Sequence, residues 1–230
     1  MILLAIDTCG TTGSIALGDL QGTSLSVLGQ AELAGGEFAA RLVQSISDLL
    51  SASGLTVSDI SGLVAVAGPG SFTGIRIGLS TVKGLAEARA LSVVTVSRLA
   101  LLAHEASTPC AALDAHRGQV FLGQFPQDGE PNELLMTAGS FTVHSRLPGS
   151  VAFCEESTAH LLETVVPDVE LVRTPAPTAA SALTFALPRW LAEDFADVAT
   201  LDGYYLRGAD AKVASIAGTK DSAAAPVHQG

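Results

Sequence analysis

A glycine-rich loop is the part of this sequence whose residue types and spacing are best suited to bind an anion. The loop, GPGSFTG, follows the apolar run at 63–67 and opens a predicted helix over 74–90. Amides at a helix N-terminus point outward with the positive end of the helix dipole behind them, so they can bind phosphate or carboxylate. Gly68, Gly70 and Gly74 are spaced as GxGxxxG, which matches neither the dinucleotide fingerprint nor the P-loop. A tight turn whose glycines only permit positive φ therefore stays open as the alternative.

Four other residues could act together with this loop. Ser71 and Thr73 supply hydroxyl groups within it, and Asp7 and Asp114 each follow an apolar strand. Acidic groups at such turns can hold nucleotide phosphates through a cation. Helix N-capping explains Ser71 and Thr73 more simply than nucleophilic catalysis does, and the chain has no GxSxG elbow. We therefore interpret the loop and both aspartates as a candidate vestigial phosphate or nucleotide site, and we predict no catalytic residue.

The histidines do not form a metal-binding pattern. No two of them are four residues apart, the spacing that places two imidazoles on one face of a helix. His104 and Glu105 begin an HExxH motif, but Thr108 takes the place of the second histidine. We expect each histidine to be a surface residue or a hydrogen-bonded core residue, and we expect no metal site. The five are His104, His116, His144, His160 and His228.

The predicted helix over 74–90 is unusual for its small residues. They recur at spacings of three or four, at Gly74, Gly78, Thr81, Gly84 and Ala88. A glycine inside a helix costs about 0.5–1 kcal/mol relative to alanine, so these positions call for the close approach of a neighbouring element. That neighbour is either the protein's own sheet or a partner. Arg76 and Lys83 lie seven apart on one face, as solvated residues or at the edge of an interface.

The remaining elements follow an α/β pattern. In the first half, strands are predicted at 2–6, 14–17, 25–30, 63–67 and 93–96, and helices at 38–50, 74–90 and 99–106. In the second half, the segment CAALDAHRGQVFLGQF predicts two strands. It is followed by a strand at 151–154 and by helices at 158–165 and 179–193, the latter interrupted by Pro188.

The strand, aspartate, turn and strand of the first half recur around Asp114, which suggests two similar lobes, although chance similarity stays open. We expect a first lobe over 1–106, a second over 107–210, and a disordered tail over 211–230.

Composition indicates a globular protein with little intrinsic affinity for nucleic acid. Of 230 residues, 48% are hydrophobic and 15% charged, and 23 acidic against 12 basic side chains give a net charge of −11. Such a surface repels RNA phosphates. The apolar start, MILLAI, lacks a basic flank and is too short for a membrane span, so we expect a cytoplasmic protein. Cys9, Cys110 and Cys154 form no CxxC pair, and we expect neither a disulfide nor zinc.

Four segments resemble the TsaB (YeaZ) family of proteins for tRNA threonylcarbamoyladenosine biosynthesis. They are AIDTCGTTGSIAL, GPGSFTGIRIGLSTVKGLA, LDAHRGQVFLGQF and the YLR of residues 205–207. The resemblance spans residues 2–207, densely in the first half and thinly over 126–200. It implies an α/β fold of two lobes like that of actin, Hsp70 and the sugar kinases, each lobe a mixed sheet flanked by helices.

The resemblance also implies a non-catalytic partner subunit. The catalytic paralogue TsaD holds a metal through two histidines four apart; family members often carry one histidine where this chain has Phe38, with Leu42 one turn later. The expected partners are a TsaD-type catalytic subunit and a TsaE-type ATPase, with tRNA bound only through the complex. The chain would hold no cofactor of its own, and ATP and threonylcarbamoyl-adenylate would belong to the partner complex.

The implied interface uses the helices at 38–50 and 74–90. We expect it to contain Phe38, Leu42, Ile46, Gly74, Arg76, Gly78, Lys83 and Gly84. Two alternatives from other classes stay open. The chain could be a kinase-like ATPase or a peptidase homologue, against which the missing motifs argue. It could also be a homodimer with no role in tRNA modification, since one apolar patch can serve self and foreign partners alike.

Overall fold

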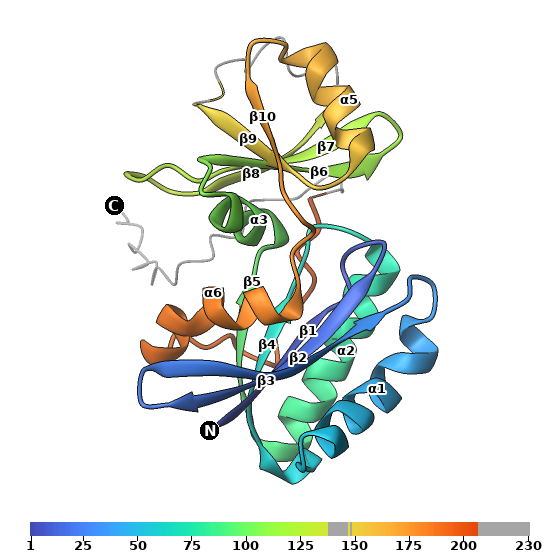
Figure 1. The fold of residues 1–230 in the computed structure, drawn as a ribbon, viewed down its shortest axis with the longest axis vertical. Coiled ribbons are helices and arrows are strands. Elements are labelled where there is room, and N and C mark those ends of the chain that lie inside the picture. The colour runs from blue at the N-terminus through green and yellow to red at the C-terminus, as the bar shows by residue number, and fades with distance from the viewer. Residues whose placement is uncertain (138–146, 148, 207–230) are drawn as a thin grey trace, which may run out of the picture.

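A computed structural model describes residues 1–137, 147 and 149–206 (Figure 1). The first sheet contains β1 (Ile2–Asp7), β2 (Gly13–Gln21), β3 (Ser24–Leu33), β4 (Ile60–Val66) and β5 (Ser92–Val96), in the order β3-β2-β1-β4-β5. The first three strands are antiparallel neighbours, whereas β4 pairs in parallel with β1 and β5 pairs in parallel with β4. Parallel strands need crossover connections, and helices provide them here.

The second sheet repeats this topology. It contains β6 (Cys110–His116), β7 (Gln119–Gln124), β8 (Asn132–Thr137), β9 (Ser150–Phe153) and β10 (Glu170–Arg173), in the order β10-β9-β6-β7-β8. Numbered from the first strand of each sheet, both orders are 3-2-1-4-5, and the pairing directions also agree. The expected fold class is thus confirmed: two similar α/β lobes, each a mixed sheet flanked by helices.

Helices cover both faces of the first sheet. On one face lie α1 (Phe38–Ala52) and α2 (Phe72–Arg89), which contact each other. On the other lies α6 (Ala179–Leu191), whose Trp190 packs against Gly62 of β4. In the second lobe, α5 (Glu156–Val165) packs against β6 and β7. A short 3₁₀ turn (Val57–Asp59) leads into β4.

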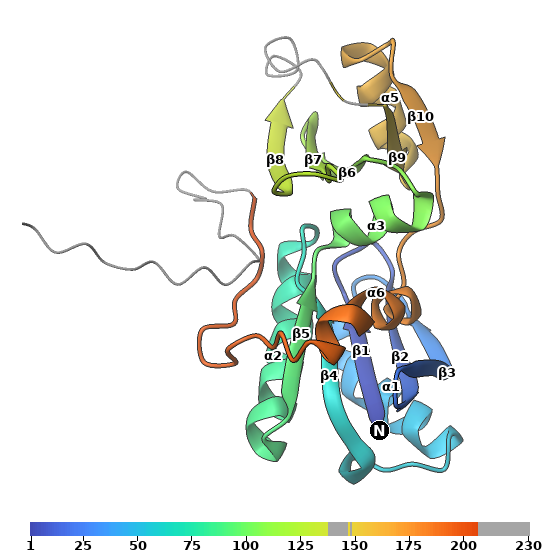
Figure 2. The same cartoon turned by 90° about the vertical axis from the view of Figure 1, so that its left-hand side faces the viewer.

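The lobes exchange the helices that follow their last strands. α3 (Arg98–Ala106) follows β5 of the first sheet, yet its Leu99 and Leu102 pack with the second sheet. α6 follows β10 of the second sheet, yet its Leu183 packs in the core of the first. The two helices lie between the sheets and contact each other (Figure 2). The expected division at residue 106 therefore does not describe α3 and α6, because each buries its apolar face against the other lobe's sheet.

After α6 the chain returns along the first lobe as a strap over residues 196–206 (Figure 2). The Ala196 amide donates to Val93 of β5, and the Tyr204 amide donates to Ala67 beyond β4. Lys83 Nζ donates to the Leu201 carbonyl at 3.1 Å, and Arg76 Nε to the Tyr205 hydroxyl at 3.3 Å. The strap thus binds two of the three cations of α2, whereas the third, Arg89, donates to the carbonyls of Val57 and Ser58.

Several element predictions needed correction. α2 begins at Phe72, two residues before the expected start, because the Ser71 hydroxyl accepts from the Gly74 amide and caps the helix. β8 and β10 were not predicted, since they are short strands in the least patterned part of the sequence. α6 runs without interruption through Pro188, which stands in its last turn, where a missing N–H removes one hydrogen bond at most. The expected disordered tail over 211–230 lies outside the described residues.

Candidate functional site

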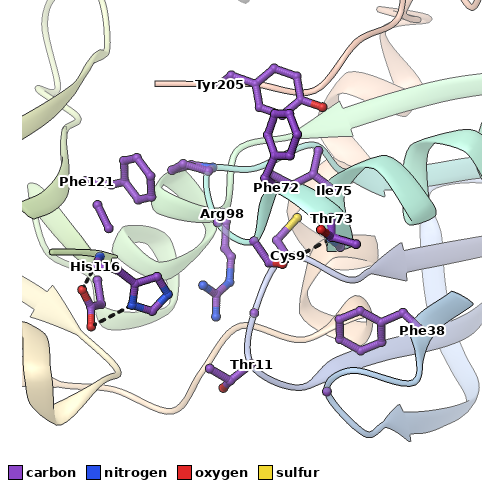
Figure 3. Close-up of a pocket in the computed structure, with 18 of the residues that line it drawn as sticks. Cys9, Thr11, Phe38, Phe72, Thr73, Ile75, Arg98, His116, Phe121 and Tyr205 are labelled. Carbon is purple, nitrogen blue, oxygen red and sulfur yellow. Dashed lines mark hydrogen bonds and ion pairs between the residues drawn. The ribbon is translucent and has the colours of Figure 1, made fainter. Parts of the chain in front are cut away.

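A cleft of about 1150 Å³ lies between the lobes. The first lobe contributes the turn after β1, the loop before α2 and the start of α1; the second contributes the turn after β6 and the segment before α5. Figure 3 shows Arg98 pointing into this cleft, with Thr11 and Cys9 on one side and His116 on the other. The structure thus brings together the two turns and the glycine loop that the sequence singled out.

The glycines of the loop are required by contacts within the protein. A Cβ on Gly70 would lie 2.2 Å from the Cys9 carbonyl oxygen, and one on Gly74 would lie 1.9 Å from that of Thr8. Gly68 has φ of +120°, and a Cβ there would lie 2.8 Å from the Tyr204 carbonyl oxygen. The open alternative, a turn whose glycines permit unusual backbone geometry and close approach, therefore explains all three, and anion binding is not needed to account for them.

The loop is also hydrogen-bonded to its surroundings. The Ser71 amide donates to the Cys9 carbonyl, and the Arg98 amide to the Gly68 carbonyl, both at 2.7 Å. The Thr8 hydroxyl, itself buried, donates to the Gly74 carbonyl at 2.7 Å. Ser71 is the N-cap of α2, as predicted, and its hydroxyl is thereby engaged. Thr73 is exposed in the first turn of α2 and lines the cleft.

The two aspartates occupy the ends of equivalent strands but differ in environment. Asp7 is 2% exposed, and its carboxylate accepts from the Cys9 amide at 2.8 Å. Burial raises the pKa of Asp7, and the nearby Arg98 opposes this shift. Asp114 borders the cleft and accepts from the His116 amide and from the Ser157 hydroxyl, both at 2.6 Å. Its hydrogen bonds hold the turn after β6.

Arg98 is the central charge of the cleft, and sequence reasoning did not single it out. It is 4% exposed, and its Nη1 lies 3.5 Å from Glu155 Oε1 of the second lobe. Burial lowers the pKa of Arg98, but the carboxylates of Asp7 and Glu155 outweigh this effect and raise it, so the guanidinium stays charged. Among the described lining residues it carries the only formal positive charge. The available signal was an arginine placed directly after a buried strand.

A second buried acid, also missed, joins the lobes. The hydroxyl of Ser97, which caps α3, donates to Glu133 Oε1 of β8 at 2.5 Å. Burial raises the pKa of Glu133 to about 7. Burial also raises the pKa of Tyr204 in the strap, and the charge of Glu133 adds to that shift. Glu133 Oε2 has no hydrogen-bond partner among the described atoms. No sequence pattern marked this residue, because a glutamate in a short strand ordinarily faces solvent.

Metal-binding geometry is not found in the part of the chain described here. No group of three or more His, Cys, Asp or Glu side chains in residues 1–137, 147 and 149–206 could hold a metal ion. His104, His116 and His160 lie apart from one another in the fold, whereas His144 and His228 fall outside the described residues. The same described portion contains no helix both long and apolar enough to cross a membrane.

Five of the expected interface residues lie inside the protein, which corrects the interface predicted from the sequence; Gly74, against the Thr8 carbonyl, is one of them. Phe38, Leu42 and Ile46 are 5%, 1% and 4% exposed and belong to the core of the first lobe. Gly78 faces inward as well, since a Cβ there would lie 2.4 Å from the Thr8 hydroxyl oxygen. An amphipathic helix buries its apolar face on its own sheet first, so the expected apolar stripe of α1 was the wrong face for a partner.

The outward faces of α1 and α2 mix small side chains with a few charged ones, among them Arg41 on α1 and Glu87 on α2. Gly84 is exposed, and a Cβ there would meet nothing within 4 Å. The same face of α2 presents Thr73, Ile77, Ser80, Thr81 and Ala88. On α1, Val43 is 70% exposed, and on α2, Phe72 is 53% exposed. Arg76 stacks on the Phe72 ring at 3.8 Å, so its charge lies beside this surface rather than within it.

Comparison with known proteins gives consistent results. Residues 30–174 match the family model TsaD, described as tRNA N6-adenosine threonylcarbamoyltransferase. The chain is 35% identical over 159 residues to the tRNA threonylcarbamoyladenosine biosynthesis protein TsaB of Escherichia coli, covering 64% of this chain and 66% of that protein. It is 32% identical over 129 residues to the TsaB of Bacillus subtilis, covering 54% and 55%. The chain thus spans between about half and two thirds of these relatives.

Solved structures extend the similarity to nearly the whole of another chain. YeaZ from Pseudomonas aeruginosa superposes with a TM-score of 0.70 and 26% identity, covering 89% of this chain and 99% of that one. A component of (R)-2-hydroxyglutaryl-CoA dehydratase from Acidaminococcus fermentans reaches a TM-score of 0.52 at 13% identity, over 84% of this chain and 99% of that one. This second likeness concerns the fold alone.

Proposed function

This chain belongs to the TsaD family, in its TsaB (YeaZ) branch, and we propose that it is a non-catalytic partner subunit in the threonylcarbamoyl modification of tRNA adenosine. The chemistry would belong to a TsaD-type catalytic subunit, and a TsaE-type ATPase would act with the pair. ATP and threonylcarbamoyl-adenylate would accordingly be ligands of the complex. The net charge of −11 supports contact with tRNA through the partner rather than through this chain.

The outward stripe of α2 is the observation that carries this proposal. Gly84 lies inside an 18-residue helix, where glycine costs about 0.5–1 kcal/mol relative to alanine. Gly74 and Gly78 are explained by the close approach of Thr8, but a Cβ on Gly84 would have no atom of the described residues within 4 Å. A partner helix packed closely on α2 would explain the glycine, because small residues allow helix axes to come near each other.

The proposed surface also has the composition of a protein interface. Val43 and Phe72 offer apolar area, and the Arg76 guanidinium stacks on Phe72. Aromatic side chains are enriched at the centres of such interfaces, and Arg76, which lies beside the surface, would contact its rim. The chain's own strap fixes Arg76 through Tyr205, so this group is ordered before any partner binds.

Substitution of Gly84 tests the proposal without disturbing the free protein. Gly84→Leu adds a side chain where this chain has open space, so its melting temperature should not fall. If a partner packs there, overpacking of about 1–3 kcal/mol should weaken binding roughly five- to a hundredfold. Titration calorimetry with the TsaD-type subunit of the same organism measures this, and nucleoside mass spectrometry of bulk tRNA measures the loss of threonylcarbamoyladenosine.

Val43→Asp provides a second test, and Leu191→Asp is its control. Both side chains are exposed, at 70% and 44%, but Leu191 ends α6 on the opposite face of the sheet. Only Val43→Asp should weaken the complex. Wild-type affinity in both Gly84→Leu and Val43→Asp would exclude this surface. Self-association of the free chain, lost in the same variants, would indicate a homodimer interface instead.

We propose further that the free chain neither hydrolyses ATP nor cleaves protein. The described lining of the cleft sets one buried cation, Arg98, against the carboxylates of Asp114 and Glu155, with Asp7 behind them. This arrangement does not favour a polyphosphate. Equilibrium dialysis of the chain with Mg-ATP, together with a phosphate-release assay, tests the statement; turnover that disappears in Asp114→Asn would contradict it.

A further inference from the structure

Arg98 holds a position that belongs to neither lobe alone. It is the first residue of α3, the helix that leaves the first sheet and packs on the second. Its amide donates to Gly68 of the first lobe. Its guanidinium lies against the turn after β1, since a Cβ on Gly10 would be 2.7 Å from Nη2. The side chain thus reaches from the junction into the turn of the first lobe while pairing with Glu155 of the second.

The two carboxylates near Arg98 come from opposite lobes and are both held in place. Asp7 ends β1 and is bound by the Cys9 amide. Glu155 directly precedes α5, and its Oε2 accepts from the Asp114 amide at 3.1 Å. Asp7 is 2% exposed, and the Glu155 side chain is 23% exposed. The Arg98 guanidinium pairs with Glu155 at 3.5 Å, and its charge also opposes the raised pKa of Asp7, so one cation acts on a carboxylate of each lobe.

We propose that Asp7, Arg98 and Glu155 form a permanent inter-lobe latch, which fixes the angle between the two sheets without any ligand in the cleft. Attraction between charges is strong in such a site because little water screens it. Without the guanidinium, two carboxylates on facing lobes would repel each other and one of them would be buried without a counter-charge, which is among the costliest changes in a folded protein. The lobes would then separate. The latch stands independently of the proposed partner.

Single-molecule energy transfer between dyes on the two lobes tests the latch. Ketone-bearing residues at the exposed positions Ser58 and His160 accept the dyes and leave the three cysteines unchanged. The wild-type chain should show one narrow distribution of transfer efficiency, unchanged by Mg-ATP. Arg98→Met keeps much of the side chain's volume and removes its charge, and it should broaden the distribution or add a population of lower efficiency.

Two further variants keep the test decisive. Glu155→Gln retains an acceptor for the Asp114 amide but removes one charge. It should broaden the distribution of transfer efficiency less than Arg98→Met does, and it still tests the latch if Arg98→Met fails to fold. Arg173→Met is the matched control, because its partner Glu156 lies in the same lobe at 3.2 Å and both side chains are exposed. The control should match the wild type.

A triple variant removes the repulsion between the two carboxylates together with the charge of Arg98. In Arg98→Met combined with Asp7→Asn and Glu155→Gln, the narrow distribution should return in part, which a loss of packing alone would not produce. A wild-type distribution in both Arg98→Met and Glu155→Gln would overturn the latch. A shift of the wild-type distribution on addition of Mg-ATP would equally overturn it, since the angle would then depend on a ligand.

Discussion

The two lobes have the same strand order, but the aspartate near the turn after the first strand is buried in the first lobe and borders the cleft in the second. In the first lobe, the glycine loop and α2 pack against Thr8 and Cys9, next to the buried Asp7, and the strand opposite Asp7 supplies Ser14. In the second, Val120 stands opposite Asp114, whose carboxylate borders the cleft and binds Ser157 in the first turn of α5. Both strand pairs are antiparallel, but β1 and β2 stop pairing at Asp7 and Ser14, whereas β6 and β7 pair on through an irregularity to His116 and Gln119. The turns therefore differ in length as well as in what packs on them. Glycines at 70, 74 and 78 allow α2 to approach without intervening side chains.

The largest expected effect comes from filling that close approach. Gly74→Ala places a Cβ 1.9 Å from the backbone oxygen of Thr8, which no rotamer change can relieve. Overpacking typically costs about 1–3 kcal/mol, and a clash with backbone should reach or exceed the upper end of that range. Urea unfolding measures the loss. If Gly74→Ala is as stable as the wild type, the turn after β1 is not closely packed against α2, and the difference drawn between the lobes is wrong.

A pH-dependent effect should come from the third strand of the second lobe. The pKa of Glu133 is raised by burial from 4.5 to about 7, so the folded protein binds this proton more tightly than the unfolded chain. The corresponding stabilisation is fully present below pH 4.5 and is lost as the pH rises to about 7 and beyond. At 1.36 kcal/mol for each unit, the loss amounts to about 3 kcal/mol.

Glu133→Gln should therefore remove this decline, and the variant should exceed the wild type in stability most clearly above pH 7. Glu32→Gln is the control, because Glu32 is exposed on β3, the third strand of the first lobe. Unfolding free energies measured between pH 4.5 and 8 distinguish the two. Parallel pH profiles for the wild type and Glu133→Gln would show that Glu133 is solvated in the folded state.

The sequence predicted more of the fold than of the candidate site. Alternating apolar strands and the aspartate at each turn indicated two similar lobes, because register and turn chemistry are local properties. The exchange of α3 and α6 left no such mark, since an apolar helix face fits either sheet. Arg98 and Glu133 were missed for the same reason: their environment is made by residues distant in the chain. N-capping was predicted for Ser71 and Thr73 and is confirmed for Ser71 alone, because Thr73 already lies in the first turn of α2.

A smaller effect is expected at the start of α6, the helix that follows the second sheet and packs on the first. The buried Ser14 hydroxyl accepts from the Ala179 amide at 2.8 Å, at the start of α6. Ser14→Ala leaves this amide without its partner and should cost about 1–2 kcal/mol. Ser157→Ala removes the exposed bond to Asp114 in the second lobe and should cost well under 1 kcal/mol. Equal losses in thermal unfolding would mean that the two turns do not differ in burial.

The smallest expected effect separates two glycines of one helix and has the opposite sign. A Cβ on Gly84 would have no atom of the described residues within 4 Å, whereas a Cβ on Gly78 would contact the Thr8 side chain. Only Gly84 therefore has space for a methyl group. Gly84→Ala should raise the unfolding free energy of the free chain by about 0.5–1 kcal/mol, the ordinary preference of a helix for alanine. Gly78→Ala should lower it, because a Cβ there would lie 2.4 Å from the Thr8 hydroxyl oxygen. Urea unfolding of both variants beside the wild type measures the difference. Higher stability in both variants would show that Thr8 moves aside readily and that the inner face of α2 is packed no more tightly than its outer face. Lower stability in both would mean that Gly84 is already in contact within the free protein, so that it would no longer support a partner helix at this position.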